Sequence, residues 1–201
     1  MPDAHRARVR VAVLISGAGS NMAALIDAGR EAHAPFEVAV VISNKADAGG
    51  VAVAAAKGVA TAVVGHGPFQ GDREAHERAV QSVLESHDVE VVALAGYMRL
   101  LTPFLVGRWA GRMLNIHPSL LPKYPGLDTH ARALAAGDAE AGCTVHVVTE
   151  GVDDGPVLGQ AVVPVQPDDT PASLAQRVLA AEHTLYPRVL ADFCRGVMTR
   201  S

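Results

Sequence analysis

Runs of consecutive apolar residues alternate, along the first half of the chain, with longer segments whose apolar side chains recur at helical spacing. Four runs have the length of strands and cover residues 9–16, 36–43, 59–64 and 89–96. The segments between them predict helices over 21–32, 46–58 and 71–87. Strands that are apolar on both faces and alternate with helices are typical of a parallel sheet covered on both sides. This half therefore predicts an α/β fold with right-handed crossovers.

The second half of the chain has a different pattern. A short helix is predicted over 102–111, which begins with Thr-Pro, a favourable pair for an N-cap and a first turn. The segment RMLNIHPSLLPKYPGLDTH (112–130) begins as a short strand and continues as a proline-rich loop. Apolar-rich strands over 143–149 and 157–165, joined by the turn DDGP, predict an antiparallel hairpin.

The last segment, 169–193, predicts a helix with Thr170 as its N-cap and Pro171 at its first position. Pro187 is expected to kink or split this helix, because proline removes a backbone donor and its ring clashes with the preceding turn. The expected buried stripe is Leu174, Val178, Leu185 and Val189. Taken together, the pattern predicts a mostly parallel twisted sheet with helices on both faces and an antiparallel hairpin near the C-terminal part.

Composition narrows the class of protein. The 201 residues suit one domain, and 49% of them are hydrophobic, which is enough for a solid core. A net charge of −4 argues against a nucleic-acid-coating surface and a basic membrane anchor, and there is no apolar run of about 18 residues. The two cysteines, Cys143 and Cys194, form no CxxC pair and are expected to be free thiols.

Two glycines follow the first predicted strand in SGAGSN (16–21). Glycine allows the backbone to approach a phosphate closely, and the helix that follows offers free N–H groups and the positive end of its dipole. The segment matches neither GxGxxG nor GxxxxGK[ST]. A tight turn with Ser20 or Asn21 as N-cap would need the same residue types, so the motif alone leaves both interpretations open.

LNIHPSLLPKYPG (114–126) is more specific. Asn115 and His117 are two residues apart in a predicted strand, so their side chains project from the same face. Pro118 places His117 at the end of that strand. An amide donor beside an imidazole suits a reaction at a carbonyl group, since the amide can hold a developing oxyanion and the imidazole can move a proton. The structural alternative is a core histidine bonded to a backbone carbonyl.

HVVTEGVDDGP (146–156) supplies carboxylates in a turn, which could orient a histidine or only face water. Other candidate chemistry is weak. The remaining histidines have no metal-ligand spacing and are expected to lie mostly at the surface; they are at positions 5, 33, 66, 76, 87, 130 and 183. No serine or cysteine has the sequence context of a nucleophile. The residues favour direct transfer to a bound amine over a covalent enzyme intermediate.

Six segments resemble blocks of the phosphoribosylglycinamide formyltransferases, also called glycinamide ribonucleotide transformylases, in family order. They are LISGAGSN, ISNKADAGG, LAGYMRLLTP, LNIHPSLLPKYPG, HVVTEGVDDGP and AEHTLYP. The resemblance runs from about Val9 to about Phe193. NIHPSLLPKYPG with a downstream DxGP is typical of enzymes that use 10-formyltetrahydrofolate, and SGxGSN near the start points to the glycinamide ribonucleotide branch.

This resemblance implies a reaction and a fold. A formyl group would pass from N10 of 10-formyltetrahydrofolate to the amine of glycinamide ribonucleotide, giving formylglycinamide ribonucleotide and tetrahydrofolate in de novo purine biosynthesis. The fold would be a Rossmann-like formyltransferase fold in a single catalytic domain, 1–201. Its N-terminal half would bind phosphate, and its C-terminal half would carry the catalytic and folate-site residues. No metal is expected, because no phosphoanhydride is cleaved.

The resemblance also assigns site residues. The catalytic residues are Asn115, His117 and Asp153. The residues expected to bind glycinamide ribonucleotide are Gly19, Ser20, Asn21 and Glu182. The residues expected at the folate site are Arg73, Met98, Arg99, Leu100, Leu101, Asn115 and Val148. The expected partners are these two small molecules, without nucleic acid or membrane, in the cytoplasm. A homodimer is one alternative for the oligomeric state, which the sequence does not give.

Three positions depart from the family pattern. Ala18 stands where asparagine is common, Asp128 where some members have histidine, and Asp154 where glycine is common. A second carboxylate at Asp154 would either perturb the pair of His117 and Asp153 or face water.

Three other functions remain as alternatives. A formyltetrahydrofolate deformylase usually has an extra N-terminal domain, and a methionyl-tRNA formyltransferase would need a C-terminal domain and a more basic surface. A non-catalytic nucleotide- or folate-binding module would not need Asn115, His117 and Asp153 together.

Overall fold

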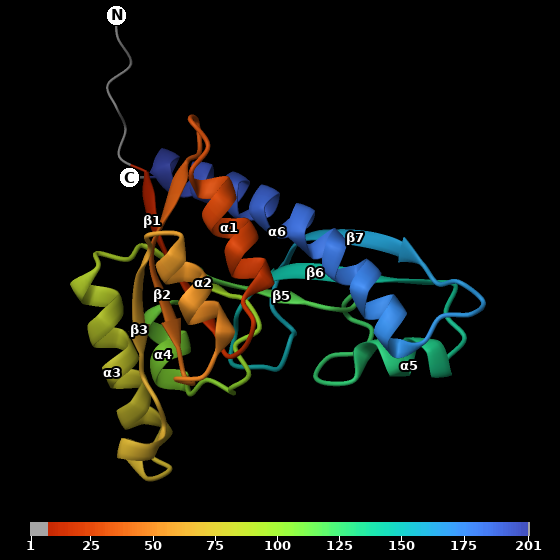
Figure 1. Ribbon diagram of the computed structural model, residues 1–201, viewed down its shortest axis with the longest axis horizontal. Coiled ribbons are helices and arrows are strands. Elements are labelled where there is room, and N and C mark those ends of the chain that lie inside the picture. The colour runs from red at the N-terminus through yellow and green to blue at the C-terminus, as the bar shows by residue number, and fades with distance from the viewer. Residues whose placement is uncertain (1–7, 201) are drawn as a thin grey trace, which may run out of the picture.

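A seven-stranded sheet with the order β3-β2-β1-β4-β5-β6-β7 organises the computed structural model, which describes residues 8–200 (Figure 1). The five parallel strands are β1 (Val9–Ile15), β2 (Phe36–Ser43), β3 (Ala60–Val63), β4 (Val91–Leu94) and β5 (Met113–His117). The antiparallel strands are β6 (Glu140–Val147) and β7 (Val157–Pro164). The predicted α/β class, the parallel sheet and the C-terminal hairpin are therefore confirmed.

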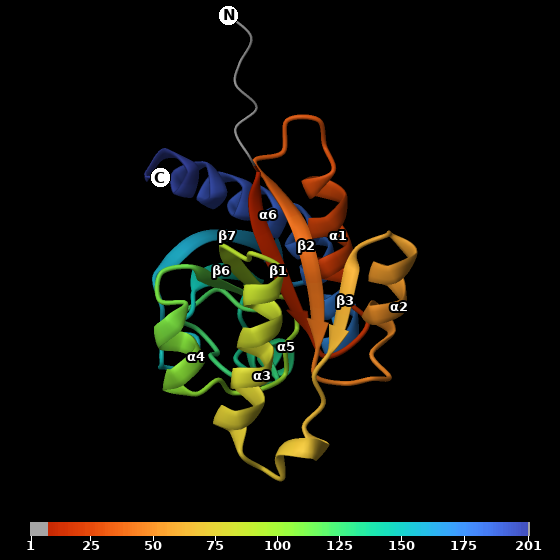
Figure 2. The same ribbon diagram turned by 90° about the vertical axis from the view of Figure 1, so that its left-hand side faces the viewer.

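Helices cover both faces of this sheet (Figure 2). One face packs against α1 (Ser20–Gly29), α2 (Gly49–Ala56) and α6 (Pro171–Arg200). The other face packs against α3 (Arg73–Ser86) and α4 (Pro103–Arg108), and a short 3-10 helix, η1 (Gly67–Phe69), precedes α3. Alternate residues of β1 enter the two cores: Val11 and Val13 face α1 and α6, whereas Ala12 and Leu14 face α3 and α4. An apolar strand without polar alternation thus has both faces buried.

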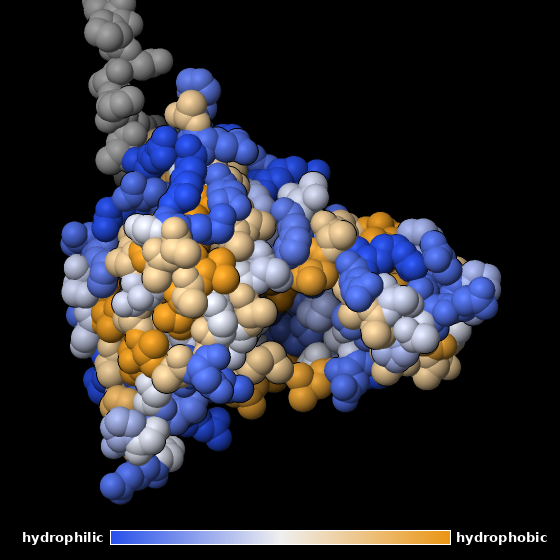
Figure 3. Space-filling model, in the orientation of Figure 1, coloured by the Kyte–Doolittle hydropathy of each residue, from blue (hydrophilic) through white to orange (hydrophobic). Residues whose placement is uncertain are grey.

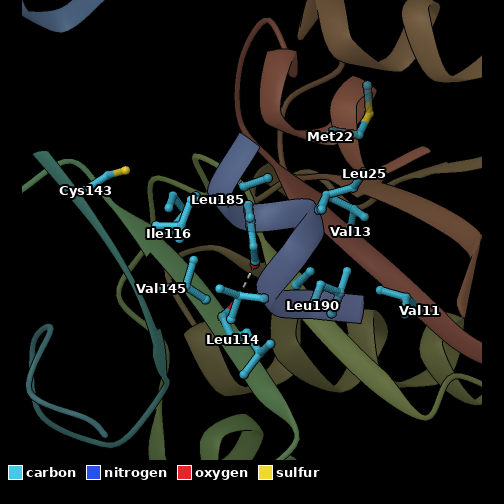
Figure 4. Close-up of a cluster of buried hydrophobic side chains, with 14 of the residues drawn as sticks. Val11, Val13, Met22, Leu25, Leu114, Ile116, Cys143, Val145, Leu185 and Leu190 are labelled. Carbon is cyan, nitrogen blue, oxygen red and sulfur yellow. Dashed lines mark hydrogen bonds between the residues drawn. The ribbon is translucent and has the colours of Figure 1, made fainter. Parts of the chain in front are cut away.

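The helix α6 joins the two parts of the molecule. It crosses the parallel strands as well as the lobe made by β6, β7 and α5 (Thr129–Ala135) (Figure 1). Its Leu185 and Leu190 pack among residues of β1, β5 and β6, as Figure 4 shows. The predicted stripe of Leu174, Val178, Leu185 and Val189 is buried, and Ser173 donates its backbone N–H to the Thr170 hydroxyl, which confirms that N-cap.

Two features of the second half differ from the prediction. Pro187 is expected to kink or split the last helix, but α6 continues through Pro187 as one helix, so a split is wrong. Packing of the residues around the proline against the sheet outweighs the lost backbone bond, since Tyr186 is fully buried. The helix α5 lies at the end of the segment interpreted as loop, and it follows a proline-rich stretch whose pattern gave no helical signal.

The strand order creates the place for a ligand. β1 pairs with β2 on one side and with β4 on the other, so the connections leave β1 and β4 in opposite directions. In such sheets a crevice opens at the carboxyl ends of the two strands. The loop 16–21 follows β1 and the segment 95–101 follows β4, so both lie at this switch point. Figure 3 shows a hollow in the surface between the part built on β1–β4 and the lobe built on β6, β7 and α5.

Candidate active site

The loop after β1 enters α1 through a left-handed glycine. Gly19 is the N-cap of α1 with φ 74°, and within the described residues no side chain caps the first turn. The alternative in which Ser20 or Asn21 serves as N-cap is therefore wrong. The N-terminus of α2 packs against this loop, where Gly50 donates its N–H to the Gly17 carbonyl at 3.0 Å. A Cβ on Gly50 would lie 2.5 Å from Cδ1 of Ile15 and 3.0 Å from the Gly17 carbonyl oxygen, so glycine favours this close approach. Uncapped N–H groups at this loop suit an anion.

Asn21 turns its side chain away from its own helix and toward α6. Its Nδ2 donates to Oε2 of Glu182 at 2.6 Å, and both side chains are buried. Burial raises the pKa of the Glu182 carboxyl, and the hydrogen bond from Asn21 opposes this shift only in part. Asn21 Oδ1 is also buried and has no hydrogen-bond partner among residues 8–200. A buried carboxylate beside an unused acceptor is suited to a ligand with hydroxyl or amine donors.

Tyr186 anchors the turn of α6 that carries Glu182. Its hydroxyl lies 3.1 Å from the carbonyl oxygen of Leu94, the last residue of β4, and 3.3 Å from that of Leu114, the second residue of β5. Burial raises the pKa of this hydroxyl well above its ordinary value, so Tyr186 remains a donor. Residues 182 and 186 are four apart and therefore share one face of the helix. This contact holds Glu182 at the carboxyl edge of the sheet.

Asn115 and His117 lie at the end of β5, as the alternation predicts, and β5 ends at His117. His117 Nδ1 lies 3.3 Å from Asp153 Oδ2, and its Nε2 lies 2.9 Å from the Tyr124 carbonyl oxygen. Asn115 Nδ2 donates to Asp153 Oδ1 at 3.5 Å. Both ring nitrogens of His117 thus face acceptors, and only a doubly protonated ring donates to both. The structure brings the three expected catalytic residues together.

Asp153 occupies a strained position in the turn between β6 and β7. Its φ of 52° is left-handed, a conformation that aspartate tolerates better than most residues. Gly155 allows the turn to close, because a Cβ there would lie 1.8 Å from the Val147 carbonyl oxygen. The carboxylate accepts the Gly126 N–H at 2.9 Å, so the proline-rich loop and the turn meet at this group.

The charge of Asp153 follows from these contacts. Burial raises the pKa of its carboxyl, but the hydrogen bond from His146, the Gly126 N–H and the charges of His117 and His146 outweigh burial and leave the pKa below its ordinary value. The carboxylate is thus ionised throughout the neutral range. A fixed negative charge 3.3 Å from Nδ1 orients the His117 ring.

His146 is the site residue that sequence reasoning missed. It lies on β6 directly opposite Asn115 and is buried. Its Nε2 is 3.2 Å from Asn115 Nδ2 and 3.5 Å from Asp153 Oδ1, and its Nδ1 is 3.0 Å from the Val147 carbonyl oxygen. His146 therefore braces two of the three expected catalytic side chains. The missing signal was the pairing of β5 with β6, which the hairpin pattern does not contain.

The segment after β4 presents the expected folate-site residues in two ways. Met98 and Leu100 are exposed apolar side chains, at 64% and 62% of their full exposure. Arg99 and Leu101 are half-buried, and Leu101 packs against the core on the α3 and α4 side. Ser16 receives the Met98 N–H at 2.8 Å, which ties this segment to the loop after β1. Exposed apolar side chains of this size suit a flat organic ligand.

The other expected folate-site residues are less closely connected. Val148 is half-buried. Its N–H donates at 2.8 Å to the carbonyl oxygen of Met113, which lies on β5 two residues before Asn115. Arg73 is exposed at the start of α3 and has no side-chain hydrogen bond or ion pair with the described part of the chain. The structure therefore does not bring Arg73 into contact with the other site residues.

The departures from the family pattern leave the catalytic residues intact. Asp154 accepts a hydrogen bond from the Thr149 hydroxyl and is exposed, so its carboxylate supports the turn instead of facing His117. Asp128 is exposed with φ 57° at the N-cap of α5. Ala18 is exposed in the loop after β1.

The expectation that the other histidines lie mostly at the surface is wrong for His76, and the described ones differ in exposure. His76 is fully buried, the rings at 66, 87, 130 and 183 are half-buried, and His33 is exposed. His5 lies outside the described residues. Cys143 and Cys194 are both free, as predicted, and buried. Within residues 8–200, no group of three or more side chains is placed to hold a metal ion, and no helix is long and apolar enough to cross a membrane.

Comparison with known proteins gives a consistent family. The profile of the formyl transferase family matches residues 9–190. The chain is 47% identical over 188 residues to the phosphoribosylglycinamide formyltransferase of Escherichia coli K12, covering 94% of this chain and 88% of that protein. The crystal structure of phosphoribosylglycinamide formyltransferase from Brucella melitensis aligns with a TM-score of 0.90 and 53% identity, covering 94% of this chain and 96% of that one.

One further match is to a much longer protein, of which the chain covers only a small part. The chain is 49% identical over 193 residues to the trifunctional purine biosynthetic protein adenosine-3 of Drosophila melanogaster. This match covers 94% of the chain but only 14% of that relative. The chain thus corresponds to one part of the trifunctional protein.

Proposed function

The chain belongs to the formyl transferase family, and on that basis we propose that it transfers the formyl group of 10-formyltetrahydrofolate to the amine of glycinamide ribonucleotide. The single domain would yield formylglycinamide ribonucleotide and tetrahydrofolate for purine biosynthesis. The observation that carries the proposal is the cluster of Asn115, His117 and Asp153 at the carboxyl edge of the sheet. The names of its relatives support formyl transfer to glycinamide ribonucleotide, and the resemblance of the motifs supports 10-formyltetrahydrofolate as the donor.

The proposed chemistry follows from the donors around Asp153. The amine attacks the formyl carbon and gives a tetrahedral oxyanion. His117 and Asn115 hold their N–H groups on Asp153 by long contacts of 3.3 and 3.5 Å, which a more basic oxyanion can take over. Asp153 keeps His117 oriented, with a negative charge beside its ring, while this occurs. A proton then moves from the attacking nitrogen to N10, and the carbon–nitrogen bond to tetrahydrofolate breaks.

The substrate-binding regions follow from the same edge of the sheet. Gly19, Ser20 and Asn21 supply the phosphate site at the start of α1, and Glu182 meets the rest of the ribonucleotide. Arg73, Met98 to Leu101, Asn115 and Val148 make up the proposed folate site. The formyl donor is a co-substrate, and the mechanism requires no metal. The two buried free thiols fit a reducing cytoplasm.

The proposed reaction is tested by the absorbance change on conversion of 10-formyltetrahydrofolate to tetrahydrofolate, with and without glycinamide ribonucleotide. Turnover is expected only when the ribonucleotide is present. Equal turnover without it would identify a deformylase and overturn the assignment of the amine substrate. Absence of turnover under both conditions would leave a binding module.

The replacement Glu182→Gln is expected to raise KM for glycinamide ribonucleotide about 10- to 100-fold, since hydrogen bonds to a charged group contribute about 1.5–3 kcal/mol. The fold is expected to be at least as stable at pH 8. Because burial raises the pKa of Glu182, the charged carboxyl disfavours the folded state above the ordinary carboxyl pKa, and glutamine removes that cost while it can still accept from Asn21. Steady-state kinetics and urea unfolding measure the two effects.

The matched control for this replacement is Glu31→Gln, which removes an exposed carboxylate after α1. It is expected to leave KM within about twofold. An unchanged KM in Glu182→Gln would remove Glu182 from the proposed ribonucleotide site. A large loss of stability without a change in KM would make it a structural residue.

A further inference from the structure

His66 contacts the proposed folate site from outside it. It lies in the loop between β3 and η1, and its side chain is half-buried. Arg99 Nη1 is 2.5 Å from His66 Nδ1, and the Asn44 amide nitrogen is 3.2 Å from His66 Nε2. The histidine therefore fills the space between the end of β2 and the segment after β4. Neither the motifs nor the proposed mechanism gives it a role.

The contact with Arg99 determines the protonation of His66. A guanidinium group has only donors, so His66 Nδ1 must be unprotonated and act as the acceptor. The titratable or charged groups around the His66 ring are the Arg99 guanidinium, the His76 imidazole and the Lys45 ammonium group, and none of them is an acid. Burial, followed by the charges of Arg99, His76 and Lys45, lowers the pKa of His66 below its ordinary value. His66 is thus neutral at pH 7, and its Nδ1 can accept a hydrogen bond from the Arg99 guanidinium.

His66 completes a ring of close polar contacts that joins the two proposed substrate sites. The Ser16 hydroxyl lies 2.6 Å from the Asn44 amide oxygen and receives the Met98 N–H at 2.8 Å. Asn44 contacts His66, which contacts Arg99, and Arg99 is the next residue after Met98. The ring therefore fixes the segment after β4 against the loop that begins at Ser16. Arg99 Nε is buried without a partner among the described residues, so His66 is the contact that anchors this side chain.

We propose that His66 is a positioning residue for the formyl donor, which holds Arg99 and the segment 98–101 in the conformation that binds the folate. The inference rests on the proposed function, because it takes that segment as the folate site. Protonation of His66 places a hydrogen on Nδ1 and replaces attraction to Arg99 by repulsion. The folate site then loosens in acid through a group that lies outside the ribonucleotide site of Asn21 and Glu182.

The replacement His66→Leu tests the acceptor. At pH 8 it is expected to raise KM for 10-formyltetrahydrofolate, and Kd for tetrahydrofolate by calorimetry, about tenfold, with kcat and KM for the ribonucleotide within about twofold. His33→Leu, at an exposed histidine, is the matched control and should change none of these values. In an Arg99→Ala background, His66→Leu should add no further loss, since it acts through Arg99.

The replacement His66→Asn tests the pH response. Asparagine can place its side-chain oxygen near the position of Nδ1, so it retains an acceptor that does not titrate. In the unaltered protein the ratio of Kd for tetrahydrofolate at pH 5.5 to that at pH 8 should be several-fold larger than in His66→Asn, because the ring charges below its ordinary pKa of about 6.5. The two proteins should bind equally at pH 8. Other titrating groups are common to both and cancel in this comparison.

The outcomes separate this inference from the proposed function. Normal turnover together with unchanged folate binding in His66→Leu, or an equal pH response in His66→Asn, would overturn the role of His66 alone. Additive losses in the double variant would also overturn it. If tetrahydrofolate binds but glycinamide ribonucleotide is not formylated, the proposed function falls while the folate-binding test of His66 still applies. Failure to bind any folate would overturn both.

Discussion

The replacement His117→Ala is expected to lower kcat by at least about 100-fold, and by as much as 10⁴-fold, the usual range for a residue that assists proton transfer. The reason is geometric, since His117 is the only one of the three clustered side chains that can both donate to an oxyanion and move a proton. KM for the ribonucleotide should stay within about threefold, because Gly19 and the pair of Asn21 and Glu182 are untouched. Steady-state kinetics with each substrate varied gives both values.

The control for this variant is His33→Ala, the same replacement at an exposed position between α1 and β2. It should retain full activity. Urea unfolding of His117→Ala shows whether the buried site collapses, and correction for the folded fraction isolates the chemical effect. Loss of ribonucleotide binding with kcat intact would contradict the assignment of His117.

The first half of the fold was predictable because strand and helix patterns there are local. β2 begins and ends where its apolar run does, at Phe36 and Ser43. The pairing of strands is not local. The apolar pattern of the hairpin predicts that β6 and β7 pair, but it does not say that β6 also lies antiparallel to β5. That pairing places His146 opposite Asn115, so the residue that braces the site had no signal in the sequence.

The candidate site likewise has features that the local sequence predicts and features that depend on tertiary structure. Alternation along one strand was enough to place Asn115 and His117 on one face. The direction of Asp154 depends on its hydrogen bond with Thr149 across the turn, and no spacing in the sequence distinguishes that from a contact with His117. His76 is one of the histidines expected mostly at the surface, yet its Nε2 meets the Val64 carbonyl oxygen at 2.7 Å inside the fold. One satisfied polar atom makes burial acceptable, and only tertiary structure shows it.

The replacement Asp153→Asn is expected to lower kcat by about 100-fold or more while the fold persists, because asparagine has nearly the same shape and can still accept the Gly126 N–H. It removes the negative charge that His117, Asn115 and His146 share. His117 then has no negative charge beside its ring, and the N–H groups that should meet the oxyanion lose their orientation. Folate and ribonucleotide KM values are expected to change far less than kcat.

The pH dependence of stability distinguishes loss of this charge from a general disturbance. The pKa of Asp153 is lowered in the folded protein, so its carboxylate stabilises the fold above the ordinary carboxyl pKa, and this stability is lost as the pH falls through the lowered value. The difference in unfolding free energy between the unaltered protein and Asp153→Asn should therefore be largest at neutral pH and shrink below about pH 4. Asp27→Asn is the control, at an exposed carboxylate that forms a surface ion pair with Lys57. Its unfolding free energy should change with pH by no more than the loss of that ion pair accounts for. A difference that persists unchanged at pH 3 would mean that the asparagine damages packing, and the loss of kcat could not then be assigned to the missing charge.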